Sequence, residues 1–301
     1  YAFAIVLIFG AVILFHEAGH FFVAKWGRIR VHEFAMGLGP VLASVKKGET
    51  QYSLRAVPVG GMVRVAGMEA EEDDLPDGFN NKPLKVRTGV IAAGPIMNIV
   101  LAAIIFCLIY SVFGIPVDAT PEIERVLSGK PAAAAGMRPG DRLVSVNGIT
   151  GSLNDLRQEI LNNPGKPVEI EVDRAGRLLP LQVVPERIKV TLEPEIKDGE
   201  LVGVRKVEKW IGQIGIVFKS KHQRLPLHQS MVVGVKETWG ILGGVGRTLL
   251  LLFQKKVPLE GISGPVGIVG MMYDEARISW FSFLRFGGMF SIMIAFFNLL
   301  P

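Results

Sequence analysis

Two histidines and a glutamate stand together in a stretch that is otherwise free of charge. Residues 1–15 carry no charged side chain, His16-Glu17-Ala18-Gly19-His20 follows, and the apolar run then continues to residue 24. On a helix, residues four apart lie on one face, so the two imidazoles can hold one divalent ion while Glu17 stands beside it as a proton acceptor. The pattern therefore predicts the chemistry of a zinc hydrolase.

The apolar surroundings make this pattern more specific than the motif alone. One charged side chain at the centre of a membrane helix costs about 2.5–3.5 kcal/mol even on a lenient insertion scale. Three ionisable groups in one apolar run therefore need a metal ion or a water-filled cavity as a partner. The alternative is that they are hydrogen-bonded inside a helical bundle for packing alone.

Two histidines do not complete a catalytic zinc site, which normally has three protein ligands. His32 lies in a polar loop beyond the expected helix, and His222 and His228 lie on the other side of the membrane in the topology given below. We expect none of these three to bind the ion. Cys107 is the only cysteine, so a Cys-rich zinc site and an intramolecular disulfide are excluded.

The composition indicates a membrane protein. Of the 301 residues, 49% are hydrophobic and only 20% charged, and the mean hydropathy is +0.37. An ordinary cytosolic enzyme is therefore not expected. The net charge of +5 is spread over the polar stretches without a concentrated basic face, so nucleic acid is not a predicted partner.

Three apolar stretches are long enough to cross a bilayer, and one mixed stretch is not apolar enough. The second span contains Gly94 and Pro95, which should kink it near its start, and the third apolar stretch, at 278–300, carries only Arg285. The expected segments are a first transmembrane helix at 1–27, a second at 88–117, an amphipathic membrane-surface segment at 220–276 and a third transmembrane helix at 277–301, cut off before its end.

The charges beside the first two spans predict which side each loop faces. Lysines and arginines flank both ends of the loop at residues 28–87, which places this loop on the cytoplasmic side. Within it, apolar and polar residues alternate at 51–55 and 59–65, as they do in strands, and glycines and prolines bound these segments. This pattern predicts a membrane-associated β-hairpin at residues 50–66. Residues 118–219 then lie outside the cytoplasm.

The outer segment contains a compact α/β unit at residues 121–186. Strands are expected at 123–127, 142–146, 168–172 and 178–184, and helices at 131–136 and 154–162. Its sequence G-M-R-P-G-D-R-L-V-S-V-N-G, at residues 136–148, resembles the signature of PDZ domains. The glycine-rich loop of such domains is found after the module, at residues 212–217, which indicates a circularly permuted form.

Taken in order, these motifs resemble those of site-2 proteases of the bacterial RseP/RasP type, specifically the members with a single PDZ domain. The resemblance covers essentially the whole chain. It rests on the PDZ-like unit and five further motifs: H-E-A-G-H at 16–20, P-V-G-G-M-V-R-V-A-G at 58–67, A-A-G-P-I-M-N at 92–98, S-G-P-V-G-I at 263–268 and N-L-L-P at 298–301.

The resemblance implies a role for each matching residue. His16 and His20 are expected to bind one Zn²⁺ per chain, with Glu17 as general base. In the family the third ligand is an aspartate a few residues after N-x-x-P, so here it is expected beyond Pro301, followed by a further span. Asn298 is expected to contact the substrate backbone; the alternative is that its hydrogen bonds are made only within the helix bundle.

The implied substrates are single-span membrane proteins such as anti-sigma factors, cleaved in the bacterial cytoplasmic (inner) membrane during regulated intramembrane proteolysis. A helical substrate must be unwound before cleavage, and the hairpin could accept the unwound strand at Gly60, Gly61, Met62 and Val63, or serve only as a structural plug. The PDZ-like domain could bind a peptide terminus or act as a size filter.

The fold class expected is therefore a polytopic α-helical membrane protein with a β-hairpin segment and an extracytoplasmic PDZ-like α/β domain, embedded in a lipid bilayer. The competing function is a membrane-anchored PDZ receptor or scaffold with an inactive metal site. An aspartate just past Pro301 would favour the enzyme over the scaffold.

Overall fold

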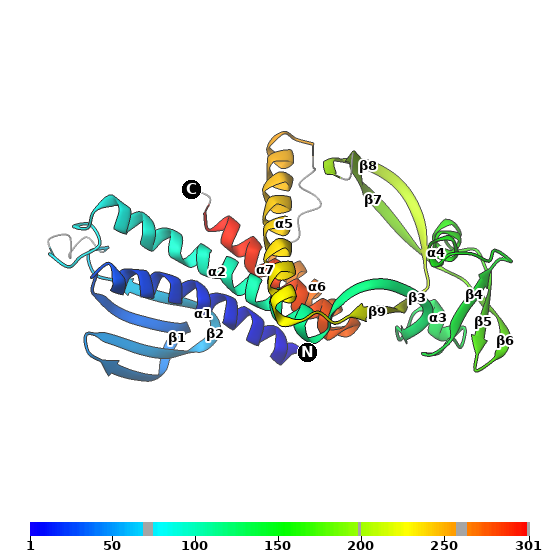
Figure 1. Cartoon of the computed structure of the whole chain (residues 1–301), viewed down its shortest axis with the longest axis horizontal. Helices are drawn as coiled ribbons and strands as arrows, with labels where there is room; N and C mark the ends of the chain where they lie inside the picture. The colour runs from blue at the N-terminus through cyan, green and yellow to red at the C-terminus, as the bar shows by residue number, and fades with distance from the viewer. Residues whose placement is uncertain (69–74, 198–199, 257–263, 300–301) are drawn as a thin grey trace. The chain divides into compact units, whose positions relative to one another are not determined.

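The computed structural model describes residues 1–68, 75–197, 200–256 and 264–299 of the chain (Figure 1). The chain divides into two compact units, which are considered separately. The first consists of residues 1–112, 225–247 and 263–301, and the second of residues 113–224 and 248–262.

Three helices of the first unit are long and apolar enough to cross a membrane, as the sequence predicts. They are α1 (Ala2–Trp26), α2 (Leu84–Val112) and α7 (Trp280–Phe297). The second span is displaced from the predicted 88–117. It ends at Val112 because Gly114 has a φ of +82°, which suits glycine at the end of a helix, and the chain then enters a strand.

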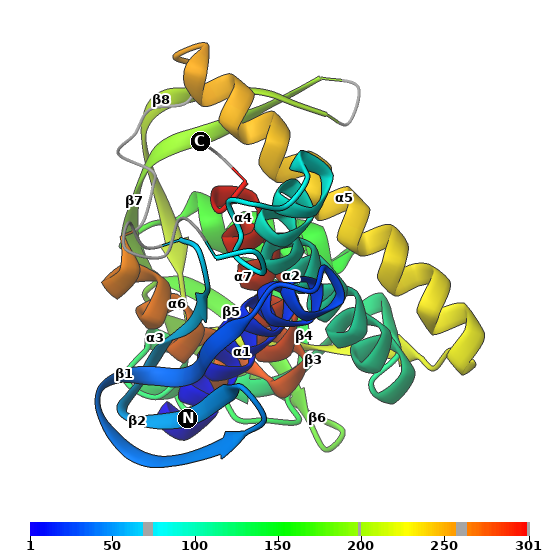
Figure 2. The same cartoon turned by 90° about the vertical axis from the view of Figure 1, so that its left-hand side faces the viewer.

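Small residues allow these three helices to approach one another closely. A Cβ atom built on Gly19 of α1 would lie 2.7 Å from the Ala93 carbonyl carbon of α2. On α7, one built on Gly287 would lie 2.8 Å from Ile8 Cδ1, and one on Gly288 2.8 Å from Phe106 Cζ. Helix α2 runs beside both α1 and α7 (Figure 2). Close contact through glycine is a common way to pack helices where lipid provides no hydrophobic driving force.

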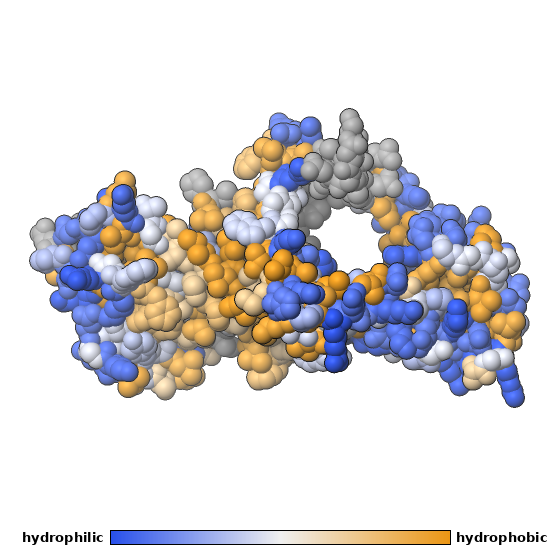
Figure 3. Space-filling view, viewed as in Figure 1, coloured by the Kyte–Doolittle hydropathy of each residue, from blue (hydrophilic) through white to orange (hydrophobic). Residues whose placement is uncertain are grey.

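The outer faces of these helices are strongly apolar. Large hydrophobic side chains on α1 and α2 are more than half exposed, among them Phe3, Leu7, Phe22, Ile91 and Leu108. Figure 3 shows hydrophobic side chains spread over the helical region on the face in view. Soluble monomers rarely expose such continuous apolar surface, so this surface suits contact with lipid.

The segment predicted to lie on the membrane surface forms two helices, α5 (Leu227–Phe253) and α6 (Pro265–Ile278). Gly234 of α5 packs directly on the backbone of Cys107 in α2, and Glu237 of α5 pairs with Arg285 of α7 at 2.8 Å. Helix α5 is not among the three candidate spans, and its position at the membrane surface stays a prediction.

The β-hairpin is larger than predicted. It is formed by β1 (Val31–Lys47) and β2 (Thr50–Val65), so the expectation of a hairpin within residues 50–66 is wrong. The predicted strand pair is one continuous strand, and its partner is β1. Gly37 and Gly39, with φ values of +88° and +81°, let β1 bend where the sequence had indicated a loop.

The bend gives the hairpin an unusual register. Residues 33–36 are in register with both 51–54 and 61–64, while 41–47 pair with 50–55. Glu33 is buried there, accepts a hydrogen bond from Ser53 and pairs with Arg55 at 2.8 Å. The Ser53 hydrogen bond and the Arg55 guanidinium hold the pKa of Glu33 below its ordinary value against the effect of burial.

The second unit contains the strands and helices predicted for the PDZ-like module, and it extends past the predicted limits of 118–219 at both ends. Five strands form one sheet in the order β6-β5-β4-β3-β9. They are β3 (Ile115–Val126), β4 (Arg142–Val146), β5 (Val168–Arg174), β6 (Arg177–Val183) and β9 (Ile216–Gln223), with helices α3 (Pro131–Ala134) and α4 (Leu153–Asn162).

Apolar side chains from this sheet and both helices form one core. Its largest fully buried members include Ile123, Val146, Leu156 and Ile170. Ser152 caps α4 in a reciprocal pair of hydrogen bonds with Asp155, which fixes where the helix begins. Not expected from the sequence is a two-stranded ribbon of β7 (Glu186–Lys197) and β8 (Glu200–Gln213), in which Pro194 obscures the strand pattern.

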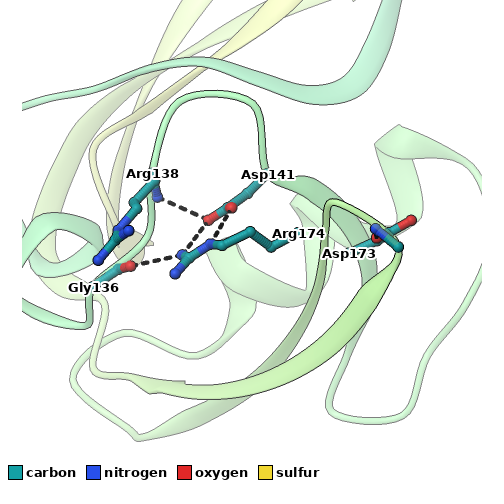
Figure 4. A network of polar contacts seen from close by, with 6 residues as sticks. Gly136, Arg138, Asp141, Asp173 and Arg174 are labelled. Carbon is teal, nitrogen blue, oxygen red and sulfur yellow. Dashed lines mark hydrogen bonds and ion pairs between the residues drawn. The ribbon is translucent and has the colours of Figure 1, made fainter.

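An ion pair fastens the start of β4 to the end of β5 (Figure 4). The Arg174 guanidinium donates to both carboxylate oxygens of Asp141 at 2.7 and 2.8 Å, and also to the Gly136 carbonyl at 2.8 Å. The Arg138 backbone N–H donates to Asp141 as well. Burial raises the pKa of Asp141, but these hydrogen bonds outweigh it and the net pKa is lowered.

This ion pair predicts acid-sensitive stability for the second unit. A carboxyl whose pKa is lowered by folding contributes stability that is complete above its unfolded pKa and is lost as the pH falls below about 4. We expect Asp141→Asn to lower hydrogen-exchange protection of β4 and β5 at neutral pH by about 1–3 kcal/mol. Asp173→Asn is the control, because Asp173 Oδ1 accepts an exposed hydrogen bond from the backbone N–H of Gly176 and takes no part in the ion pair. Equal protection in both variants would contradict this role.

The predicted topology can be tested with single cysteines. In a Cys107→Ser background, Gln158→Cys in α4 should react with a membrane-impermeant maleimide in intact cells, because basic flanks hold the other loop inside. Lys47→Cys, at the exposed turn of the hairpin, should react only after the cells are opened. The opposite labelling pattern would reverse the orientation.

Candidate active site

Helix α1 brings His16 and His20 onto one face, as their spacing predicts. Their Nε2 atoms are 3.2 Å apart, and the two rings meet edge to face. Both side chains are partly buried between α1 and α2. The convergence of two ring nitrogens on one point is the arrangement that metal binding requires.

The other ring nitrogen of each histidine is held by α2. His20 Nδ1 donates to the Val90 carbonyl oxygen at 2.6 Å, which leaves His20 Nε2 with a free lone pair. His16 Nδ1 lies 3.3 Å from Nδ2 of Asn98. Both imidazoles are thus oriented by partners on the neighbouring helix, which metal-binding histidines generally are.

Glycine at position 94 makes room for the histidine pair against α2. A Cβ atom built there would lie 2.7 Å from His16 Cε1 and 2.8 Å from His16 Nε2, and would also collide with His20 Nε2. Any side chain at this position would occupy the space into which the two ligand nitrogens point.

The hairpin passes beside the predicted base. A Cβ atom built on Gly61 of β2 would lie 2.7 Å from Glu17 Cγ and 2.9 Å from Ile13 Cγ2. The backbone of β2 is therefore in direct contact with the helix face that carries Glu17. Of the predicted substrate-binding residues, Gly60, Gly61, Met62 and Val63 all lie in this strand.

The histidine pair fits a zinc ion. Two nitrogens bound at about 2.0–2.1 Å to a tetrahedral ion stand about 3.3–3.4 Å apart, close to the observed 3.2 Å. Within the described residues no group of three His, Cys, Asp or Glu side chains is gathered, so the third ligand is not found there. An aspartate beyond Pro301 stays the prediction for that position.

The remaining candidates lie elsewhere. His32 lies in β1, His222 in β9 and His228 in α5. Asn298 is the exposed residue that ends α7, and its expected contact with substrate stays a proposal. Sequence reasoning assigned no function to Asn98 and treated Gly94 only as part of a kink. The sequence feature that could have indicated Asn98 is its polar carboxamide within the charge-free residues 88–117.

A comparison with known families decides the class of protein. The model of peptidase family M50 matches residues 4–301. This chain belongs to peptidase family M50. The M50 match and the three membrane-capable helices make it an intramembrane metalloprotease of the site-2 type, as the motifs had suggested.

Curated relatives are similar to nearly the whole length of this M50 chain. A candidate zinc metalloprotease of Clostridium acetobutylicum is 33% identical over 300 residues, which is 98% of this chain and 81% of that protein. The zinc metalloprotease RasP of Geobacillus kaustophilus is 28% identical, covering 98% and 84%. The regulator of sigma-W protease RasP of Bacillus subtilis is 27% identical, covering 99% and 85%. The M50 chain is accordingly a zinc metalloprotease.

The closeness of α2 to the histidines yields a prediction. Gly94→Ala should abolish zinc retention and proteolysis, because its methyl group takes the space beside both Nε2 atoms. Zinc content of the purified protein is the measurement. Gly89→Ala is the matched control on the same helix, since a Cβ there meets only Val23 Cγ1 at 3.7 Å. Wild-type zinc content in Gly94→Ala would contradict the site.

Proposed function

We propose that this M50 protease hydrolyses a peptide bond within or near the transmembrane segment of single-span membrane proteins in the bacterial inner membrane. His16 and His20 bind one zinc ion, with an aspartate beyond Pro301 as third ligand, and Glu17 is the general base. The observation that carries the proposal is the convergence of the two Nε2 atoms at 3.2 Å, inside a membrane-capable helix and beside β2.

The hairpin supports a role in presenting the substrate. Among the described strand pairings, residues 61–64 are paired on one side only, with residues 33–36. An unwound substrate could add to their free edge and replace the hydrogen bonds lost from its helix. The contact of Gly61 with Glu17 would then bring the added strand next to the base. A purely structural plug needs no such free edge beside Glu17.

The division of labour follows from these positions. When bound, zinc polarises the scissile carbonyl and lowers the pKa of the attacking water. Glu17 takes a proton from that water as the water oxygen bonds to the carbonyl carbon. Glu17 then delivers the proton to the amide nitrogen as the carbon–nitrogen bond breaks. Val90, through its carbonyl, holds the His20 ring in place throughout.

Anti-sigma factors are the substrate class we favour. The support is the relative from Bacillus subtilis, which is named for regulation of sigma-W. In the proposed topology the PDZ-like domain lies outside the cytoplasm. There it either binds a chain terminus at the 212–217 loop or limits the size of approaching substrates. A scaffold with an inactive metal site is the alternative function, and it predicts no cleavage of any single-span protein.

Replacement of the base should separate catalysis from metal binding. Glu17→Gln keeps the side-chain shape but cannot accept the proton, so cleavage of a single-span substrate should fall at least ~10²-fold. Zinc content should stay at the wild-type level, because Glu17 is not a ligand. The substrate should accumulate as a stable complex with the variant. Rates are measured with purified full-length protein in lipid vesicles.

Two other variants make this result interpretable. His16→Ala and His20→Ala should lose both zinc and cleavage, which separates ligand from base. Cleavage by Glu17→Gln at the wild-type rate with zinc bound would refute the general-base role. Loss of zinc from Glu17→Gln would instead make Glu17 a ligand or structural residue.

A further inference from the structure

Asn98 of α2 is a fully buried polar residue in the charge-free part of the membrane unit. Its exposed fraction is 0%, and Ser291 of α7 donates a hydrogen bond to its backbone carbonyl at 2.8 Å. The side-chain Nδ2 lies 3.3 Å from His16 Nδ1. Its Oδ1 is buried and has no hydrogen-bond partner among the described residues. An unpaired buried acceptor is costly, so this carboxamide calls for an explanation.

One orientation of the Asn98 carboxamide would place the ring proton of His16 on the nitrogen that faces the zinc site. If Asn98 Nδ2 donates to His16 Nδ1, the ring proton of neutral His16 must be on Nε2. That N–H points at His20 Nε2, 3.2 Å away, which can accept because His20 Nδ1 donates to Val90. The chain of hydrogen bonds is consistent, but in it His16 Nε2 carries a proton and cannot bind a cation.

A half turn of the Asn98 carboxamide reverses this arrangement. The amide and carbonyl ends are nearly equal in size, so their exchange needs no extra space. Oδ1 would then accept from a proton on His16 Nδ1, and the unpaired acceptor would be satisfied. His16 Nε2 would be left with a free lone pair beside that of His20. This is the tautomer that zinc ligation requires.

We infer that Asn98 is a positioning residue that selects the tautomer of His16, with its Oδ1 accepting a hydrogen bond from His16 Nδ1 when His16 is a zinc ligand. The inference rests on the proposed zinc ligation by His16 and His20. The Nδ1 atoms of the two histidines have different neighbours: His20 Nδ1 faces a backbone carbonyl, which can only accept, whereas His16 Nδ1 faces a carboxamide, which can donate or accept.

The test measures zinc affinity of the purified full-length protein by chelator competition. Asn98→Leu keeps the side-chain size but has no acceptor, so zinc should bind about 10–100-fold more weakly. Asn98→Asp offers an acceptor oxygen in either protonation state and should stay within about threefold of wild type. Ser291→Ala is the packing control, because it removes the hydrogen bond to the Asn98 backbone carbonyl and leaves the Asn98 side chain and His16 unchanged. This variant should bind zinc normally.

A second measurement reads the tautomer directly in the wild-type protein and does not depend on a folded variant. In the ¹⁵N spectrum of labelled histidine, the zinc form should show His16 bound to zinc through Nε2 and protonated on Nδ1, with that proton exchanging slowly because it is held in a buried hydrogen bond. Ligation through Nδ1 with the proton on Nε2, or a rapidly exchanging Nδ1 proton, would overturn the inference.

The affinities distinguish failure of the inference from failure of the site. Wild-type affinity in Asn98→Leu, or equal loss in Asn98→Leu and Asn98→Asp, would overturn the acceptor role while His16→Ala still lost zinc. If His16→Ala kept its zinc, the proposed ligand set itself would be wrong. Weak binding by Asn98→Leu alone, with normal binding by Asn98→Asp and Ser291→Ala, is the supporting result.

Discussion

Polar groups inside a membrane must find their partners within the protein, and this constraint organises the first unit. His16, Glu17 and His20 interrupt an apolar helix, so another element must approach closely enough to hydrogen-bond them. Helix α2 does so for the two histidines, with the Val90 carbonyl and the Asn98 carboxamide. That approach is possible only because Gly19 and Gly94 remove side chains from the contact. The hydrogen bonds from α2 to the histidines therefore depend on the glycines that let the two helices approach.

The same constraint would act on the hairpin, which packs against α1 and which we predict to be membrane-associated. Strand edges cannot face lipid with unpaired N–H and C=O groups, because each costs several kcal/mol in hydrocarbon. Strand β2 avoids part of this cost by pairing residues 61–64 with β1 and by packing Gly61 directly on the helix that bears Glu17. The bend at Gly37 and Gly39 brings residues 33–36 between two segments of β2, and this leaves little backbone unpaired in the middle of the hairpin.

Local patterns made the spans and the small strands and helices of the second unit predictable, whereas long-range pairing was not. Apolar length identified α1, α2 and α7, and turn signals bounded β4 and α4 nearly at their observed ends. The partner of β2 was missed because glycine bends inside β1 look like a loop in sequence. His16, Glu17 and His20 could be found from one helical spacing. Asn98 could not, because its meaning depends on where α2 passes α1, which no spacing within α2 encodes.

The geometry also accounts for how a membrane helix could become cleavable at all. A substrate carbonyl in an intact helix is already hydrogen-bonded, and opening one turn exposes several backbone groups that lipid cannot satisfy. Opening is thus strongly unfavourable unless another backbone replaces the lost hydrogen bonds at the same place. A strand edge can do this for any sequence, because it pairs with main-chain atoms and not with particular side chains. Gly61, which belongs to this strand, contacts Glu17, so in the proposed mechanism the position where unwinding is compensated would also be close to the group that transfers the proton.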